Sequence, residues 1–143
     1  MIKKRCLSVL IVVLLCCFAL SAQTNDKNIF SLRRQRVRDQ LEDKSIAILR
    51  NPKLVTRNND QEYFYRADSN FYYLTGCDEP GSILVLIPSV DPQFILFVKP
   101  TSLMDALWHG DLMGIDGAVK KLQADKAYAL DQFQEMLRTI ARR

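Results

Sequence analysis

The stretch DQEYFYRADSNFYYLTGCDEP, residues 60–80, decides the fold of this chain. Aromatic side chains bring a large apolar area, and a tyrosine adds a hydroxyl group that needs a hydrogen-bond partner when it is buried. Composition alone leaves open whether the rings serve packing or binding. Six of the chain's aromatic residues lie within residues 63–73: Tyr63, Phe64, Tyr65, Phe71, Tyr72 and Tyr73.

The first 22 residues are predicted to be a secretory signal peptide. Three basic residues at positions 3–5 precede a nearly unbroken apolar run over residues 7–20, and small residues up to Ala22 follow it. The run is shorter than the roughly 20 residues that a membrane-spanning helix needs, so a retained anchor is the second alternative. We expect export to the periplasm or the medium, with no membrane attachment after cleavage.

Removal of residues 1–22 changes the charge balance of the chain. Three of the 20 basic residues leave, so 17 face 16 acidic residues and the net charge falls from +4 to +1. A nucleic-acid partner is therefore not expected, and the arginines of a predicted first helix are interpreted as a solvated face. Cys77 becomes the single thiol. The remaining length fits one domain.

Hydrophobic patterning predicts an α/β or α+β layer fold. Continuous apolar runs are typical of strands buried on both faces, and a Pro/Asp-rich turn between two of them favours a hairpin. Asp116 and Asp131 are predicted to cap two of the helices. A domain that stops at an amphipathic helix leads us to expect a further strand. The predicted helices cover residues 30–42, 101–107, 116–122 and 131–143, and the predicted strands cover residues 45–50, 83–87, 94–98 and 127–130.

The search for chemistry finds few candidates. His109 is the single histidine, the acidic residues are scattered, and no phosphate-binding glycine pattern exists, so no metal or nucleotide site is predicted. Cys77 and His109 form a possible nucleophile pair, although Cys77 also fits a small apolar residue near a turn. Trp108, in a glycine-punctuated segment, fits either core packing or a partner or substrate surface.

Two motifs carry a resemblance to a known family. Residues 57–80 read R-x-x-D-x-E-Y-x-Y-R-x-D-S-N-F-Y-Y-L-T-G-x-x-E-P, and residues 108–114 read W-x-G-x-x-x-G in the right order. Residues 29–143 resemble the N-terminal domain of Xaa-Pro aminopeptidase (aminopeptidase P), which is related to the same domain in prolidase and creatinase. The resemblance implies a mixed β-sheet flanked by helices, in a domain that helps to build dimers or tetramers.

The catalytic half of the family is expected to be absent from this chain. In the full enzymes, a C-terminal "pita-bread" domain holds two manganese ions and cleaves the bond before a penultimate proline. No residue of this chain matches those metal ligands, so the chain alone is predicted to bind no manganese and to be inactive. The resemblance implies accessory roles at the substrate cleft for Asp60 and Trp108. Cys77 and Ala106 depart from the family pattern, the latter by replacing an acidic residue near the tryptophan.

Three hypotheses for the function follow. The first is a non-catalytic domain of an exported Xaa-Pro metalloaminopeptidase, which serves oligomerisation and shapes the cleft for peptides with proline second. Its partners would be the catalytic domain and further copies of the chain. The second is a stand-alone interaction domain that binds through the aromatic stretch, and the third is an enzyme that uses Cys77 and His109. On the first hypothesis most rings serve packing, and Arg66 and Asp68 satisfy each other or nearby backbone.

Overall fold

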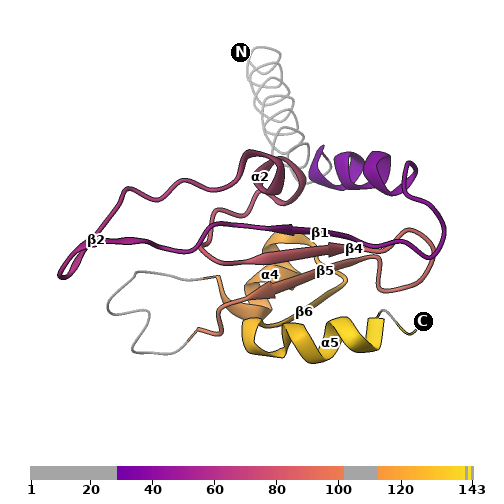
Figure 1. Ribbon diagram of the computed structural model, residues 1–143. Helices are drawn as coiled ribbons and strands as arrows, with labels where there is room; N and C mark the ends of the chain where they lie inside the picture. Colours follow the sequence, from indigo (N-terminus) through magenta and orange to yellow (C-terminus); the bar gives the residue numbers. More distant parts are fainter. Residues whose placement is uncertain (1–28, 102–112, 141, 143) are drawn as a thin grey trace, which may run out of the picture.

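The computed structural model describes residues 29–101, 113–140 and 142, which form a mixed sheet with helices on both faces (Figure 1). The predicted signal peptide and the predicted helix over residues 101–107 lie outside these residues, apart from residue 101. The first described element is a helix over residues 29–38. The others are β1 (Ala47–Arg50), β2 (Thr56–Asn58), β3 (Gln61–Glu62), α2 (Ser69–Thr75), β4 (Ile83–Leu86), β5 (Phe94–Val98), α4 (Gly114–Leu122), β6 (Lys126–Ala129), the 3₁₀ turn η1 (Leu130–Gln132) and α5 (Phe133–Ile140).

The main sheet has the strand order β1-β4-β5-β6. β4 pairs antiparallel with both β1 and β5, and β5 pairs parallel with β6. The β4–β5 connection is the predicted hairpin, closed by a 2.9 Å hydrogen bond from Ile87 N to Gln93 O. The parallel pair needs a crossover, which α4 supplies. The predicted mixed sheet is therefore confirmed.

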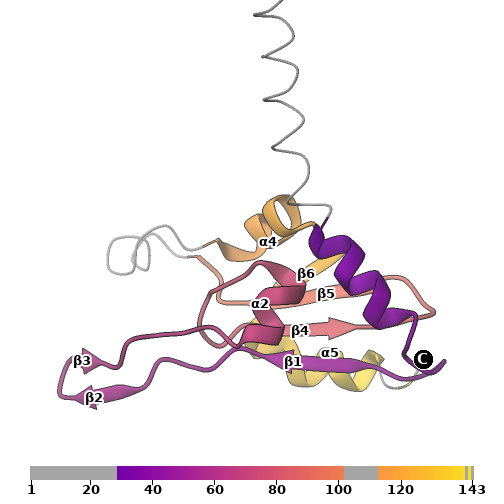
Figure 2. The same cartoon turned by 90° about the horizontal axis from the view of Figure 1, so that it is seen from above.

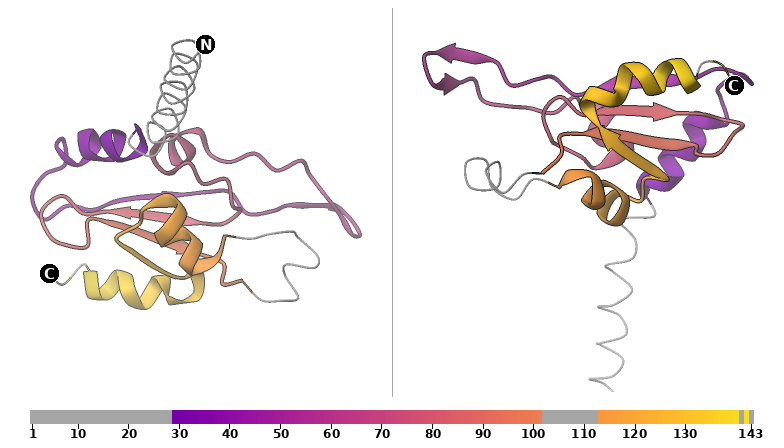
Figure 3. Two further views of the ribbon diagram at one scale, coloured as in Figure 1. Left: turned by 180° about the vertical axis from the view of Figure 1, so that it is seen from behind. Right: turned by 90° about the horizontal axis from the view of Figure 1, so that it is seen from below.

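The central strands are buried on both faces, as their continuous apolar sequences predict. Successive side chains of a strand point to opposite faces, so Leu84 and Leu86 join one core while Ile83 and Val85 join the other. The helix over residues 29–38, α2 and α4 cover the first face, whereas α5 covers the second (Figures 2 and 3).

Helix α2 lies inside the aromatic stretch, where the sequence analysis predicted no element. Asp68 caps its start, because its Oδ1 accepts a hydrogen bond from Phe71 N at 2.9 Å. Gly76 ends it with a φ of 69°, and a Cβ at this position would lie 2.8 Å from the Phe30 ring. Phe71 and Leu74 face the core. The second half of the aromatic stretch, with Phe71, Tyr72 and Tyr73, is therefore helical, whereas the rings at positions 63–65 precede the helix.

Several predicted helix boundaries are wrong. The first helix ends at residue 38 instead of 42. Asp116 lies in the first turn of α4 and does not cap it, since α4 begins after Met113 without a side-chain cap. Asp131 lies inside η1, and the Oε1 of Gln132 instead accepts a hydrogen bond from the N–H of Ala129, the residue that precedes η1. Helix α5 ends at Ile140.

The basic face of the first helix is not uniformly solvated, which corrects the interpretation from sequence. Arg34 is only 3 % exposed. Its Nη1 donates to Leu74 O at 2.9 Å, and its guanidinium lies 3.9 Å from the centre of the Phe94 ring. Arg33 donates to Tyr73 O at 3.1 Å. The two arginines therefore bond carbonyl groups at the end of α2, which the helix itself leaves unpaired.

Candidate functional site

A two-stranded arm projects from the body of the domain (Figures 1 and 2). It is the hairpin of β2 and β3, whose residues are all exposed. The turn between the strands contains Asn59, with a φ of 46°, and the exposed Asp60. The structure thus places Asp60, the accessory residue that the resemblance suggested, at the tip of a projection and away from the core.

The arm is closed at its root by Asn51, which is 4 % exposed. The Oδ1 of Asn51 accepts a hydrogen bond from the backbone N–H of Asp68 at 3.0 Å, which joins the two ends of the arm. The Nδ2 donates to the carbonyl oxygen of Glu79 at 3.1 Å and, more weakly, to that of Cys77 at 3.4 Å. One buried amide therefore connects the arm to the turn that leads into β4.

The side chain of Glu79 continues this connection to the start of α4. Its Oε1 accepts a hydrogen bond from Met113 N, whereas its Oε2 is buried with no hydrogen-bond partner among the described residues. Burial raises the pKa of the Glu79 carboxyl, and the charge of Asp78 acts in the same direction. The Met113 N–H and the charge of Lys121 oppose the rise.

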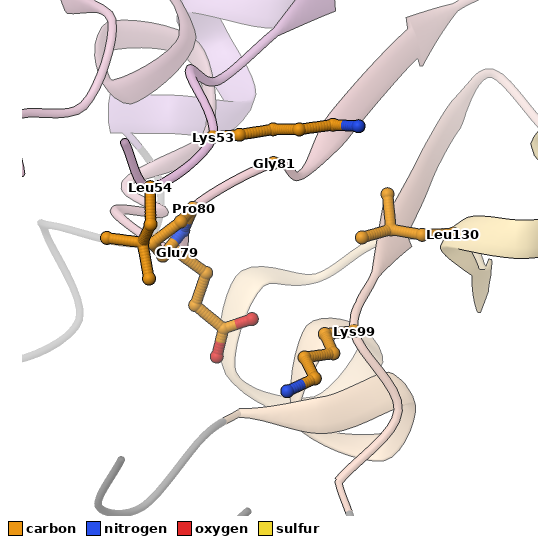
Figure 4. A pocket seen from close by; sticks show the side chains of 7 residues that line it. All are labelled: Lys53, Leu54, Glu79, Pro80, Gly81, Lys99 and Leu130. Carbon is orange, nitrogen blue, oxygen red and sulfur yellow. The ribbon is translucent and has the colours of Figure 1, made fainter. Parts of the chain in front are cut away.

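A cavity of about 380 Å³ lies beside Glu79 (Figure 4). Lys53 and Leu54 at the root of the arm, the turn over residues 79–81, Lys99 and Leu130 line it. Figure 4 shows the Glu79 carboxylate extending from the turn toward the Lys99 side of the cavity. The arm root, the turn and the end of β5 therefore meet at one edge of the domain.

The aromatic stretch exposes most of its rings, so the prediction that they serve packing within this chain is wrong. Phe71 is fully buried, whereas four other rings are about half exposed or more: Tyr63 57 %, Phe64 97 %, Tyr72 50 % and Tyr73 49 %. Tyr63 and Phe64 lie in the arm directly after β3, whereas Tyr72 and Tyr73 lie on α2. Large exposed apolar side chains indicate surfaces that can bind a partner. We call these four residues together the aromatic surface.

Arg66 and Asp68 were predicted to satisfy either each other or nearby backbone, and the structure supports the second alternative for Asp68. Its side chain accepts a hydrogen bond from the backbone of α2. Arg66 donates to Ser69 Oγ at 3.3 Å. Arg66 also lines a surface hollow of about 570 Å³ together with Tyr65, Tyr72 and Tyr73.

Trp108 and His109, the remaining candidates from the sequence, lie outside the described residues. Cys77 is described and is 2 % exposed. Burial raises the pKa of its thiol to about 11. Because the thiolate is the nucleophile, a buried thiol with a raised pKa is poorly suited to covalent catalysis. The geometry thus supports the alternative in which Cys77 is a small apolar residue near a turn.

Within the described residues, no group of three or more histidine, cysteine or acidic side chains is arranged to hold a metal ion. A pair of manganese ions therefore has no fitting ligand set there. The same part of the chain has no helix that is both long and apolar enough to cross a bilayer.

Two residues of this region were not singled out from the sequence. Asn51 directly follows the predicted strand over residues 45–50, and Glu79 belongs to the motif over residues 57–80. The sequence indicates a structural role for Asn51 and Glu79 only because each precedes a proline near a strand end, where irregular backbone needs side-chain partners. Their bonds join residues 17 to 34 positions apart, which no local pattern encodes.

Comparisons with known proteins agree on one family. Residues 30–143 match the family model described as "Aminopeptidase P, N-terminal domain". The Xaa-Pro aminopeptidase of Escherichia coli K12 is 38 % identical over 110 residues, which cover 76 % of this chain and 25 % of that protein. Human Xaa-Pro aminopeptidase 3 is 39 % identical over 100 residues, which cover 66 % of this chain and 20 % of the human protein.

Solved structures show the same similarity. The aminopeptidase PepP of Pseudomonas aeruginosa superimposes with a TM-score of 0.76 at 36 % identity, over 80 % of this chain and 26 % of that one. The aminopeptidase P of E. coli, in its low-pH form, gives a TM-score of 0.74 at 36 % identity. The chain thus spans about a quarter of the length of these bacterial proteins.

Proposed function

The chain belongs to the aminopeptidase P family, as its N-terminal domain, and from this premise we propose that it serves an exported Xaa-Pro aminopeptidase as a non-catalytic domain. Such an enzyme releases an N-terminal residue that precedes proline. The observation that carries the proposal is the match of the N-terminal domain model to residues 30–143. Export rests on the signal-peptide pattern of residues 1–22.

The chemistry of the reaction belongs, in this proposal, to a partner catalytic domain. Two manganese ions would there supply the activated water. The described residues of this chain offer no ligand set for them, so we derive no reaction step from this chain. Its contribution is geometric: it associates with further copies of itself and shapes the cleft that receives a peptide with proline second.

Two features of the surface support that geometric role. The arm holds Asp60 at its tip, where a side chain can reach into a neighbouring molecule. The arm also carries Phe64 of the aromatic surface, which is 97 % exposed. Aromatic residues are enriched at the centres of protein interfaces because they bury a large area with few rotatable bonds.

A chimera tests the proposal directly. This chain replaces the matching N-terminal quarter of the E. coli Xaa-Pro aminopeptidase, and release of the first residue from a peptide with proline second is measured with manganese. We expect turnover by the chimera and none by the chain alone. A chimera that is folded and metal-loaded but inactive would refute the cleft-shaping role, and metal-dependent turnover by the chain alone would refute the non-catalytic role.

The aromatic surface also favours a second candidate function, that of a stand-alone interaction domain. In this case the rings bind a different protein rather than a copy of the chain or a catalytic domain. An inactive chimera, together with a chain that unfolds cooperatively and stays monomeric at high concentration, would favour this alternative over the first.

A further inference from the structure

The surface hollow of about 570 Å³ beside α2 has no part in the proposed function. Figure 2 shows α2 between the first helix and the segment that returns from the arm, and these elements form the walls of the hollow. The first helix contributes Arg33, the returning segment contributes Tyr65 and Arg66, and α2 contributes Tyr72 and Tyr73. We call it the tyrosine hollow. Its volume is that of a typical ligand-binding pocket.

The first helix holds the two tyrosine rings of α2 in place. The rings of Phe30 and Tyr72 meet edge to face, with their centres 6.4 Å apart and their planes at 82°. The guanidinium of Arg33 lies 4.0 Å from the centre of the Tyr73 ring, and it also donates a hydrogen bond to Tyr73 O at 3.1 Å. Both tyrosine rings are nevertheless about half exposed. They are therefore fixed before a ligand arrives, which lowers the entropy that binding costs.

The returning segment supplies hydrogen-bond donors to the hollow. The Tyr65 hydroxyl is buried with no hydrogen-bond partner among the described residues. Burial raises the pKa of Tyr65 to about 12, so the hydroxyl remains a protonated donor. Buried hydroxyl groups are normally paired, and an acceptor on a ligand in the hollow can supply the missing partner. Arg66 is exposed, and its bond to Ser69 Oγ uses one of the five N–H donors of a guanidinium group.

The charges of the hollow favour a ligand without net charge. Arg33 and Arg66 oppose a cation, whereas Asp78 lines the same hollow and opposes an anion such as a phosphate. The ligand should therefore be neutral, with hydrogen-bond acceptors for the donors and apolar faces for the rings. A chain in the polyproline II conformation has these properties, because its carbonyl groups make no internal hydrogen bonds and its proline rings pack in aromatic-lined grooves.

We propose that the tyrosine hollow binds a proline-rich segment of a peptide or protein in the polyproline II conformation. The proline rings pack against the exposed faces of Tyr72 and Tyr73, and backbone carbonyl oxygens of the segment accept hydrogen bonds from Tyr65 and Arg66. This binding site goes beyond the proposed function, because it recognises an extended stretch of chain rather than the bond before a penultimate proline. It is a property of this chain and needs no catalytic domain.

Isothermal titration calorimetry measures binding of the purified full chain to a polyproline peptide that is blocked at both ends and therefore carries no charge. A blocked Gly-Ser peptide of the same length is the control, since it presents the same backbone carbonyl groups on a flexible chain without rings. We expect saturable binding of polyproline and no binding of the Gly-Ser peptide at the same concentrations. Maltodextrin, a neutral sugar polymer rich in hydroxyl groups, is titrated in parallel.

Two variants locate the site. Tyr72→Ala removes a ring and Arg66→Gln removes donors, and each should weaken polyproline binding about fivefold or more. Tyr72→Phe keeps the ring and should bind nearly as well as the unaltered chain, as should the matched control Val119→Ala, which shortens an exposed apolar side chain of α4. Circular dichroism checks the fold of each variant. If Tyr72→Ala does not fold, Arg66→Gln decides alone, because Arg66 is exposed.

Absence of saturable polyproline binding, equal binding of the Gly-Ser peptide, or equal affinities of Arg66→Gln and Val119→Ala would overturn the inference. Binding of maltodextrin without binding of polyproline would also overturn it and would assign the hollow to sugars. An inactive chimera beside a chain that binds polyproline would refute the proposed function alone. An active chimera beside a chain that does not bind polyproline would refute this inference alone.

Discussion

Replacement of Arg34 by methionine tests whether a buried cation holds the first helix to α2. Arg34 is 3 % exposed, and its guanidinium lies against the Phe94 ring while Nη1 bonds Leu74 O. Methionine keeps an apolar, flexible side chain but removes both the charge and the donor. The backbone carbonyl of Leu74 then loses the partner that closes the end of α2.

The magnitude follows from opposing contributions. A hydrogen bond from a charged donor contributes about 1.5–3 kcal/mol, and a desolvated cation–π contact contributes about 2 kcal/mol. Burial lowers the pKa of Arg34 from 12.5 to about 10, which corresponds to a cost on the order of 3 kcal/mol for the buried charge. The net gain is thus about 0.5–2 kcal/mol. A Leu74 carbonyl left unpaired adds about 1–3 kcal/mol to the loss.

We therefore expect Arg34→Met to lower the free energy of unfolding by about 1.5–5 kcal/mol. Urea unfolding followed by circular dichroism measures the change, with an unchanged dependence on urea as the sign that the native state is intact. Arg36→Met on the same helix is the control, because Arg36 is exposed, and its effect should stay within about 0.5 kcal/mol. Buried charges can be replaced by apolar groups without loss, so equal stabilities for the two variants would refute the reasoning.

Three further predictions concern other parts of the domain. Burial raises the pKa of Glu79 above its ordinary 4.5, so the folded chain binds a proton at this carboxyl more tightly than the unfolded chain does. The contribution of this group to stability therefore falls as the pH rises above about 4.5. Urea midpoints should fall more steeply from pH 4.5 to 8 in the unaltered chain than in Glu79→Gln, and parallel curves would contradict this. Phe64→Ser should change stability by no more than about 0.5 kcal/mol but weaken self-association in sedimentation experiments. Phe71→Ala, in the core, should instead lower stability by about 3–5 kcal/mol. Unchanged self-association of Phe64→Ser would speak against the aromatic surface as the interface. Alkylation of Cys77 at pH 8, followed by mass spectrometry, should be roughly a hundredfold slower in the native chain than in urea, because a pKa of about 11 leaves little thiolate. Equal rates would show that the thiol is accessible.

The sheet could be predicted from the sequence because its central strands are continuous apolar runs that fit only burial on both faces. Helix α2 was not predicted, although Asp68 and Gly76 stand at its two ends as cap residues, because aromatic residues at the consecutive positions 71–73 hide the one-face spacing of a helix. Arg34 offered a similar indication. It lies four residues after Phe30 and three before Val37, on the apolar stripe of its helix, and a basic residue at such a position faces inward.

The candidate site was predictable only in part. The resemblance singled out Asp60, and the structure places it at the tip of the arm, a position that no periodicity in the sequence predicts. The role of Glu79 could not be foreseen, because its bond to Met113 depends on the packing of α4 against the sheet. The exposure of the rings could not be predicted either, because the same aromatic residue types pack against a partner and in a core.

The arm cannot hold its position by its own burial. The residues of β2 and β3 are all exposed, and an isolated two-stranded hairpin is at best marginally stable in water. Its placement therefore depends on the bonds at its root, where Asn51 and Glu79 connect it to the sheet and to α4. The rigid part of the domain thus ends, at the root of the arm, in one small cluster of buried polar groups. An arm to which the domain's own fold supplies few contacts is suited to presenting its tip to another molecule, which is the role that the proposed function assigns to Asp60.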